Sequence, residues 1–200
     1  MRRLIVLVST MALTLLVAGG AALAATIHCP NDSSQGSPVE GLFCYGTSAA
    51  DTMSCSDLFD FMYGKGGADT MHGYGDRDYL QGDKGSDHIY GDAGADASLW
   101  GGAYDPSTDT YTDTSDDYVH GASGGDTIHG GIAQGGVDRL YGEAGNDLIR
   151  ASQREHNMNT LVPNVPVTKE IIDCGGGQSD VVRFDEGVDV VTNCETKDPF

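Results

Sequence analysis

The chain has 200 residues, enough for one domain, and carries 30 acidic against 11 basic residues, a formal net charge of −19. This charge argues against nucleic acids and anionic membrane surfaces as partners, because both repel an acidic protein. The 29 glycines indicate many turns. Acids held close together in a repeat would also oppose folding in the absence of cations.

The N-terminus has the pattern of a cleavable export signal. Arg2 and Arg3 precede a mostly apolar stretch, residues 4–17, and residues 22–24 offer a small-x-small cleavage site. The alternative is a membrane anchor, but the apolar stretch is short for a span and small residues follow it directly. We therefore expect a signal peptide at residues 1–24 and a secreted, extracellular protein without membrane insertion.

Beyond a predicted N-terminal cap at residues 25–45, aspartates recur at steps of nine residues. Gly lies five positions before most of them, and Met or an aliphatic residue lies two positions after most of them. A stretch rich in Thr, Ser and Asp, about residues 103–116, interrupts the register, and a slip of three follows Asp126. The aspartates in register are Asp51, Asp60, Asp69, Asp78, Asp87, Asp96, Asp117, Asp126, Asp138 and Asp147.

Each nine-residue unit predicts a Gly-rich turn followed by a three-residue strand. In a strand the middle side chain points one way and its neighbours the other, so the apolar residue is expected to face a core. Two units then make one flattened coil with a strand on each side, and coils stacked about 4.8 Å apart form two short parallel sheets. The outward-facing neighbours are expected to be Tyr63, His72, Tyr90, His120, His129 and Tyr141.

The units GDKGSDHIY, GASGGDTIH and GEAGNDLIR and the segment GDAGAD resemble the RTX, or haemolysin-type, calcium-binding nonapeptide repeat, with the consensus G-G-x-G-x-D-x-U-x. The resemblance covers residues 46–150 with two interruptions and, weakly, residues 175–191. It implies an all-β fold, a parallel β-roll (β-solenoid) with two repeats per coil. It also implies that backbone carbonyls and the sixth-position Asp of successive same-side turns hold Ca²⁺, so all ten aspartates are expected metal ligands.

Turns on the same side of the roll are two units apart, so the ten aspartates should divide between two edges. One edge is expected to carry Asp51, Asp69, Asp87, Asp117 and Asp138, and the other Asp60, Asp78, Asp96, Asp126 and Asp147. Oxygen ligands in flexible loops suit Ca²⁺, whereas Mg²⁺ requires a tighter octahedron and keeps its waters. Without a cation, carboxylates stacked a few ångström apart would repel each other strongly.

The units at both ends of the repeat depart from the consensus. One N-terminal unit has Cys55 in the first position and Leu58 in place of the fourth-position Gly. We therefore expect fewer metals at the N-terminal end than in the centre. After an irregular insertion at residues 151–174, the degenerate last units are expected to form a C-terminal cap at residues 175–200.

Five cysteines in an exported chain indicate disulfides. Cys174 and Cys194 bracket the last repeats and are expected to pair as a terminal staple, with Cys29–Cys44 as the second pair and Cys55 left over. Other pairings stay open, since connectivity does not follow from sequence. A metal–thiolate cluster is a weaker alternative, because no C-x-x-C spacing occurs.

No motif indicates a catalytic site, and the chain is not expected to be an enzyme. The aspartates of the inserted stretch lack the EF-hand spacing and indicate a solvated loop. Residues 121–125 read GASGG but form a turn inside the repeat, without the strand-to-helix context of a nucleophile elbow, and the segments outside the repeat are too small for a catalytic core. Where histidines flank the strand centres, an outward ladder is favoured over a zinc or copper site; these are His72, His88, His120 and His129.

The predicted function is a secreted calcium-binding repeat protein in which Ca²⁺ drives extracellular folding and leaves a rigid surface for structural or adhesive contacts. Its expected partners, besides calcium, are cell-surface or matrix polysaccharides or proteins. The alternative is a polysaccharide-modifying enzyme, lyase- or epimerase-like, built on the solenoid. The candidate residues for that activity are Arg139, Arg150, Tyr141 and His129. A lytic toxin is less favoured, because no amphipathic or apolar segment remains after signal cleavage.

Overall fold

The computed structural model describes residues 23–29, 42–102, 104–105, 110–111, 113–131, 136–151, 155–156, 160–161 and 168–199. Most of the predicted signal peptide, residues 1–22, lies outside these ranges. Within them the regular structure consists of strands, and no helix has the length and apolar character needed to cross a membrane.

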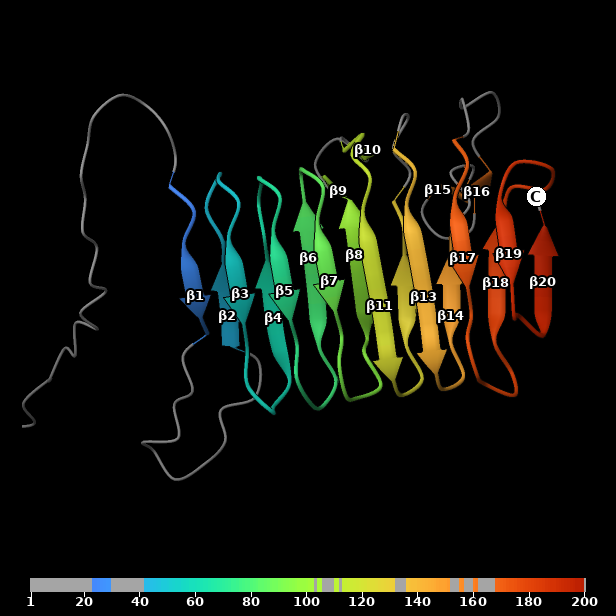
Figure 1. Ribbon diagram of the computed structural model, residues 1–200, viewed down its shortest axis with the longest axis horizontal. Coiled ribbons are helices and arrows are strands. Elements are labelled where there is room, and N and C mark those ends of the chain that lie inside the picture. Colours follow the sequence, from blue (N-terminus) through green and yellow to red (C-terminus); the bar gives the residue numbers. More distant parts are fainter. Residues whose placement is uncertain are drawn as a thin grey trace, which may run out of the picture.

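Two eight-stranded parallel sheets form the body of the molecule, and the chain passes from one to the other at every turn. Figure 1 shows the strands side by side along the long axis, from β1 at the blue end to β20 at the red end. Sheet A contains β1 (Thr26–His28), β3 (Thr52–Ser54), β5 (Thr70–His72), β7 (His88–Tyr90), β11 (Tyr118–Ser123), β13 (Arg139–Ala144), β17 (Ile171–Asp173) and β19 (Val190–Thr192). Sheet B contains β2 (Leu42–Tyr45), β4 (Asp60–Tyr63), β6 (Tyr79–Asp83), β8 (Ser98–Gly102), β12 (Thr127–His129), β14 (Leu148–Arg150), β18 (Val181–Phe184) and β20 (Thr196–Pro199).

Two short antiparallel pairs lie outside these sheets. β9 (Tyr104–Asp105) pairs with β10 (Thr110–Tyr111), and β15 (Glu155–His156) pairs with β16 (Thr160–Leu161). Both pairs occur where the nine-residue register is interrupted. The coils resume after each of them, so the insertions leave the stacking order of the two sheets unchanged.

The core is a double column of apolar side chains held in register between the two sheets. Met71 of β5 is aligned with Ile89 of β7, which is aligned with Val119 of β11, and all three are fully buried. Burying a side chain of this size contributes about 1.5–3 kcal/mol, before the cost of chain ordering. The predicted parallel β-roll, with an apolar residue two positions after most of the aspartates, is therefore confirmed; after Asp96 the core residue is Leu99, one place later. The fully buried members of the column are Met53, Met62, Met71, Leu80, Ile89, Leu99, Val119, Ile128, Leu140, Ile149, Ile172 and Val182.

The sheets extend beyond the segment in which the Asp period is regular. β1 and β2, within the predicted N-terminal cap, pair in parallel with β3 and β4 and add one coil. β17 lies in the stretch expected to be an irregular insertion, yet it pairs with β13 and β19 as a regular member of sheet A. The reason is that Ile172 keeps the apolar register, while Glu170 stands where the repeat would have Asp.

The outer face of sheet A carries a ladder of stacked rings, as predicted. Ring centroids are 4.6 Å apart between His72 and Tyr90, 5.2 Å between Tyr90 and His120, and 4.6 Å between His120 and Tyr141. On sheet B the expectation for His129 was wrong, because this side chain is only 6% exposed. Its ring stacks on Trp100 of β8 at 4.0 Å. Burial, followed by the charge of Arg150, lowers the pKa of His129 to about 3 and keeps it neutral.

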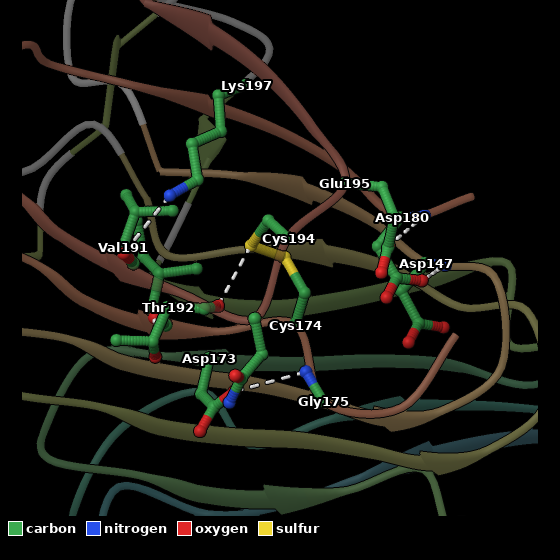
Figure 2. The surroundings of a disulfide bond; sticks show 12 residues. Asp147, Asp173, Cys174, Gly175, Asp180, Val191, Thr192, Cys194, Glu195 and Lys197 are labelled. Carbon is green, nitrogen blue, oxygen red and sulfur yellow. Dashed lines mark hydrogen bonds between the residues drawn. A yellow bond between two sulfur atoms is a disulfide. The ribbon is translucent and has the colours of Figure 1, made fainter. Parts of the chain in front are cut away.

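Two disulfides close the ends of the roll, and both agree with the predicted pairing. Cys29–Cys44 joins the residue after β1 to β2, and Cys174–Cys194 joins the residues that follow β17 and β19 (Figure 2). Cys55 is a free thiol. A disulfide at a terminal coil restricts fraying where only one neighbouring coil is available for packing.

Candidate metal centre

The predicted aspartates form one continuous row along each edge of the roll. In each row the backbone N–H of one Asp donates to Oδ1 of the Asp one coil further along. On the sheet A side these bonds measure 2.7 Å from Asp51 to Asp69, 2.8 Å from Asp69 to Asp87, 2.9 Å from Asp87 to Asp117 and 3.0 Å from Asp117 to Asp138. On the sheet B side they measure 2.8 to 2.9 Å and join Asp60, Asp78, Asp96, Asp126 and Asp147. The predicted division between two edges is confirmed.

Both rows continue past the predicted residues. Asp138 N–H donates to Oε2 of Glu170 at 2.6 Å, and Glu170 N–H donates to Oδ1 of Asp189 at 2.9 Å. On the other edge, Asp147 N–H donates to Asp180 and Asp180 N–H donates to Glu195, at 2.8 and 3.0 Å; Figure 2 shows these three residues. The sequence prediction followed the nine-residue pattern through Asp alone and therefore did not include Glu170 or Glu195.

The first-position glycines of the repeat leave room for the carboxylates. A Cβ at Gly73 would lie 2.6 Å from Oδ2 of Asp78 and 2.8 Å from the carbonyl oxygen of Gly91 in the next coil. Contacts this short are not tolerated, so any other residue would displace the carboxylate or the neighbouring backbone. The glycine thus brings two oxygens, one carboxylate and one carbonyl, close to the same point.

Second-position residues in the central turns have left-handed backbone conformations although none is Gly. Their φ angles lie between 68° and 75°. Such conformations cost a residue with a Cβ about 1–2 kcal/mol each. The residues are Lys65, Tyr74, Asp83, Asp92, Ala122 and Glu143. By contrast, Thr47 and Ser56, which hold this position in the first two turns, do not have positive φ.

The second carboxylate oxygen distinguishes the central turns. In six of them Oδ2 is buried and has no hydrogen-bond partner among the described residues. Leaving a buried ionised oxygen unsatisfied is costly, which makes each of these atoms a candidate cation ligand. The six residues are Asp69, Asp78, Asp87, Asp96, Asp126 and Asp147.

In the first two turns, at the N-terminal end, Oδ2 of the repeat Asp accepts hydrogen bonds from the protein itself. Oδ2 of Asp51 accepts a hydrogen bond from Thr47 N–H at 2.6 Å. Oδ2 of Asp60 accepts from the N–H of Ser56 at 3.0 Å and from its hydroxyl at 2.8 Å. These donors reduce the need for a cation, which supports the expectation of fewer metals at this end.

In the central turns of both rows, burial and neighbouring charges raise the pKa of the aspartates and so disfavour their ionised form when no cation is bound. Burial raises the pKa of Asp78 and of Asp87 to about 8, in part offset by the backbone N–H each accepts. For Asp117, burial followed by the charge of Asp138 raises the pKa to about 10. A divalent cation between coils would remove this penalty. Clustered carboxylate and carbonyl oxygens fit Ca²⁺.

The described residues suggested for catalysis do not converge on one site. Arg139 and Tyr141 lie on β13 of sheet A, whereas His129 and Arg150 lie on β12 and β14 of sheet B. These four residues therefore cannot act together at a single groove.

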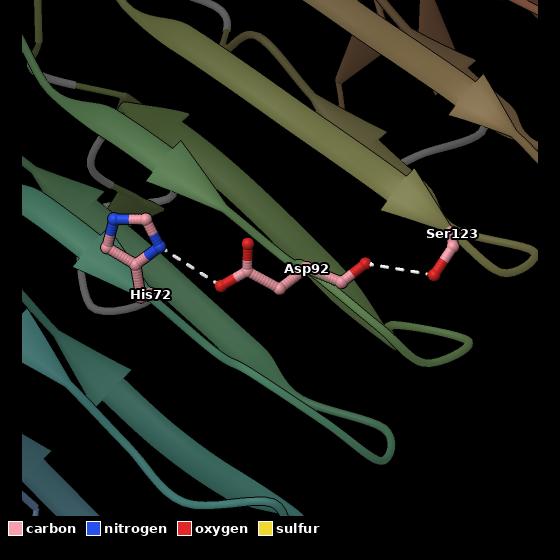
Figure 3. Close-up of polar contacts among 3 residues, drawn as sticks. All are labelled: His72, Asp92 and Ser123. Atoms are coloured by element: carbon pink, nitrogen blue, oxygen red, sulfur yellow. Dashed lines mark hydrogen bonds and ion pairs between the residues drawn. The ribbon is translucent and has the colours of Figure 1, made fainter.

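A Ser, a His and an Asp do lie in line on the surface (Figure 3). His72 Nδ1 is 3.0 Å from Oδ2 of Asp92, but the Ser123 hydroxyl donates to the backbone carbonyl of Asp92 at 3.3 Å. The hydroxyl is thus directed at a carbonyl rather than at the imidazole, and the three side chains do not form a nucleophile–base pair.

Comparison with known families identifies a repeat family in the centre of the chain. Residues 63–97 and 111–149 match the family model described as the RTX calcium-binding nonapeptide repeat, in four copies. The matched segments contain the six predicted aspartates with an unpaired Oδ2, together with Asp117 and Asp138. Asp51 and Asp60 fall outside them. No curated protein and no solved structure matches the chain.

Proposed function

We propose that this chain, which carries RTX calcium-binding nonapeptide repeats and binds Ca²⁺ through them, is a secreted scaffold. In this proposal the chain folds around calcium outside the cell. The observation that carries this proposal is the set of buried, unpaired Oδ2 atoms in the central turns. Each of them lies beside a first-position glycine, as Asp78 does beside Gly73.

The proposed ligands are the ten aspartates of the two rows, together with backbone carbonyls of the turns. The central aspartates are the strongest candidates, because their Oδ2 atoms have no protein donor within the described chain. Asp51 and Asp60 are the weakest, because Thr47 and Ser56 already donate to them. Bound Ca²⁺ supplies the positive charge that these rows lack.

Calcium binding and folding should be coupled. The rows exist only when the coils are stacked, so the free energy of binding appears as stability of the folded state. Without calcium, the protein must bury carboxylates whose pKa values are raised or protonate them. We infer that the chain stays unfolded where free calcium is scarce and becomes ordered after export.

A structural or adhesive role fits the outer faces of the folded roll. The outer face of sheet B presents Phe43 and Tyr45, on β2, with 55% and 53% of their surface exposed. Sheet A presents the stacked His and Tyr ladder. Rigid aromatic surfaces of this kind suit contact with cell-surface or matrix polysaccharides or proteins.

A far-UV circular dichroism titration tests the proposal. The protein in chelator is titrated with Ca²⁺, and Mg²⁺ serves as the control. We expect a cooperative gain of β structure with Ca²⁺ and little change with Mg²⁺. A full β spectrum that chelator does not alter would contradict the coupling of calcium to folding.

A further inference from the structure

Asp113 occupies an unexpected position in the molecule. It belongs to the inserted stretch that the sequence predicts to be a solvated loop, but its side chain is only 5% exposed. Its Oδ2 is buried and, among the described residues, has no hydrogen-bond partner. For this residue the prediction of a solvated loop was wrong, since the chain returns to the roll before the regular register resumes at Asp117.

The surroundings show how the insertion enters a repeat turn. A Cβ at Gly101 would lie 2.6 Å from Oδ2 of Asp117, so Gly101 takes the place of the first-position glycine for that turn. The inserted residues therefore interrupt the turn after its first position. Asp113 then packs against the backbone of Gly102: a Cβ built on Gly102 would lie 3.4 Å from Cβ of Asp113.

The hydrogen bonds of Asp113 identify what it replaces. In regular turns the fourth-position N–H donates to the third-position carbonyl of the next coil, as from Gly67 to Lys84 at 2.9 Å and from Gly124 to Ala144 at 2.8 Å. At Gly85 the N–H points instead at Oδ1 of Asp113, at 3.4 Å. A carboxylate thus stands where other turns have a backbone carbonyl, and its second oxygen is left over.

The added charge affects the neighbouring row. The carboxylate of Asp113 contributes to the raised pKa values of Asp87, Asp117 and Asp138, after the larger effects of burial. This part of the sheet A edge therefore concentrates more negative charge than a regular turn. Affinity for Ca²⁺ rises with the number of charged ligands in a site.

We propose that Asp113 is an additional calcium ligand, supplied by the insertion to the turn between the coils of Asp87 and Asp117. This inference rests on the proposed function, because it takes calcium to bind between the turns. Its consequence is that calcium at this turn fixes the inserted stretch to the roll.

The test compares two Asp→Asn variants of the full chain. Asp113→Asn keeps an oxygen that can accept the N–H of Gly85 but removes the charge. Asp116→Asn is the matched control, since Asp116 lies in the same stretch, is exposed, and also accepts a backbone N–H, from Val137 at 2.8 Å. Calcium affinity and stoichiometry are measured by titration calorimetry, and folding is checked by circular dichroism.

We expect Asp113→Asn to lose one calcium or to bind it about tenfold or more weakly, and Asp116→Asn to match the wild type. If both variants bind like the wild type, the role of Asp113 is overturned while calcium binding stands. If the wild type itself binds no calcium, the proposed function fails as well.

A second measurement on the wild type does not depend on a variant that folds. Amide exchange of Gly85 and Thr114, whose N–H groups both point at Asp113, is followed by NMR with and without calcium. Calcium should slow both amides, with Gly67 as the reference for a regular turn. Unchanged exchange at Gly85 and Thr114 while Gly67 becomes protected would overturn the inference.

Discussion

The central and terminal turns share one hydrogen-bond pattern between coils but differ in how they satisfy Oδ2 of the repeat Asp. In both, an Asp accepts a backbone N–H of the preceding coil through Oδ1, as Asp96 does in the centre and as Asp51 and Asp180 do towards the ends. In the central turns Oδ2 is left buried and unpaired, whereas in the first two turns Thr47 or Ser56 donates to it. Near the other end, Gly177 N–H donates to Oδ2 of Asp180 at 3.3 Å.

This difference shows how a repeat can be ended without changing its fold. The terminal turns satisfy their carboxylates with protein donors and are closed by disulfides. The central turns instead hold second-position residues such as Lys65 and Ala122 in a left-handed conformation and leave an oxygen free. We infer that the centre depends on calcium and that the ends depend on the chain itself.

Removing one carboxylate should affect the centre most. In Asp96→Asn the site should lose its calcium, and a site saturated at 100 times its Kd contributes about 2.7 kcal/mol of stability. Asp60→Asn should change the calcium-dependent part of the unfolding free energy by much less. Urea unfolding at a high and at a low calcium concentration, both sufficient to keep the protein folded, measures both. Equal calcium-dependent losses in the two variants would refute the distinction between centre and end.

A methyl group placed in the centre should disturb the site by sterics alone. We expect Gly73→Ala to destabilise the calcium-bound protein by about 1–3 kcal/mol, because its Cβ would overlap Oδ2 of Asp78. Gly66→Ala is the control, since its Cβ would lie 3.5 Å or more from its neighbours. Thermal unfolding in calcium compares them. A Gly73→Ala protein as stable as Gly66→Ala would argue against a tightly filled turn.

The pH dependence of the calcium-free protein should be inverted relative to most proteins. Asp78 and Asp87 have pKa values of about 8 in the fold, against about 3.9 for an unfolded Asp. The folded state thus binds more protons between these values, so stability is greatest near pH 4 and is lost as pH rises through 8. Far-UV circular dichroism in chelator from pH 4 to pH 8 measures the folded fraction, which should fall as pH rises. A β signal that grows as pH rises would contradict this expectation.

The smallest effect concerns backbone strain in the central turns. Ala122 has φ 75°, so Ala122→Gly should stabilise the folded protein by up to about 1 kcal/mol. Ala144, exposed on β13, does not have positive φ, and Ala144→Gly should destabilise by about 0.5–1 kcal/mol. Chemical unfolding in calcium compares the two. The same sign for both substitutions would show that the left-handed conformation is not the cause.

Most of the roll could be predicted from two features of the sequence, the nine-residue Asp period and the apolar residue two positions later. Together they predict both rows, the core column and the alternation between sheets. Glu170 and Glu195 were missed because the pattern was followed through Asp alone, although Ile172 two positions after Glu170 preserves the register.

Other features depend on contacts that a local pattern does not contain. Asp113 resembles its acidic neighbours in sequence, and only the path of the insertion buries it beside Gly85. His129 occupies an outward position, but stacking on Trp100 of the neighbouring coil covers it. The partners of Oδ2 likewise depend on whether the second-position backbone turns its N–H toward the carboxylate, as at Thr47.

The most direct test of the difference between centre and ends is the location of bound calcium. A crystal grown in calcium, with anomalous data collected at long wavelength, would show the ions individually. We predict strong peaks between the coils beside Asp69, Asp78, Asp87 and Asp96, and the weakest peaks beside Asp51 and Asp60. Calcium of equal occupancy along the whole of both rows, or none in the central turns, would contradict this account.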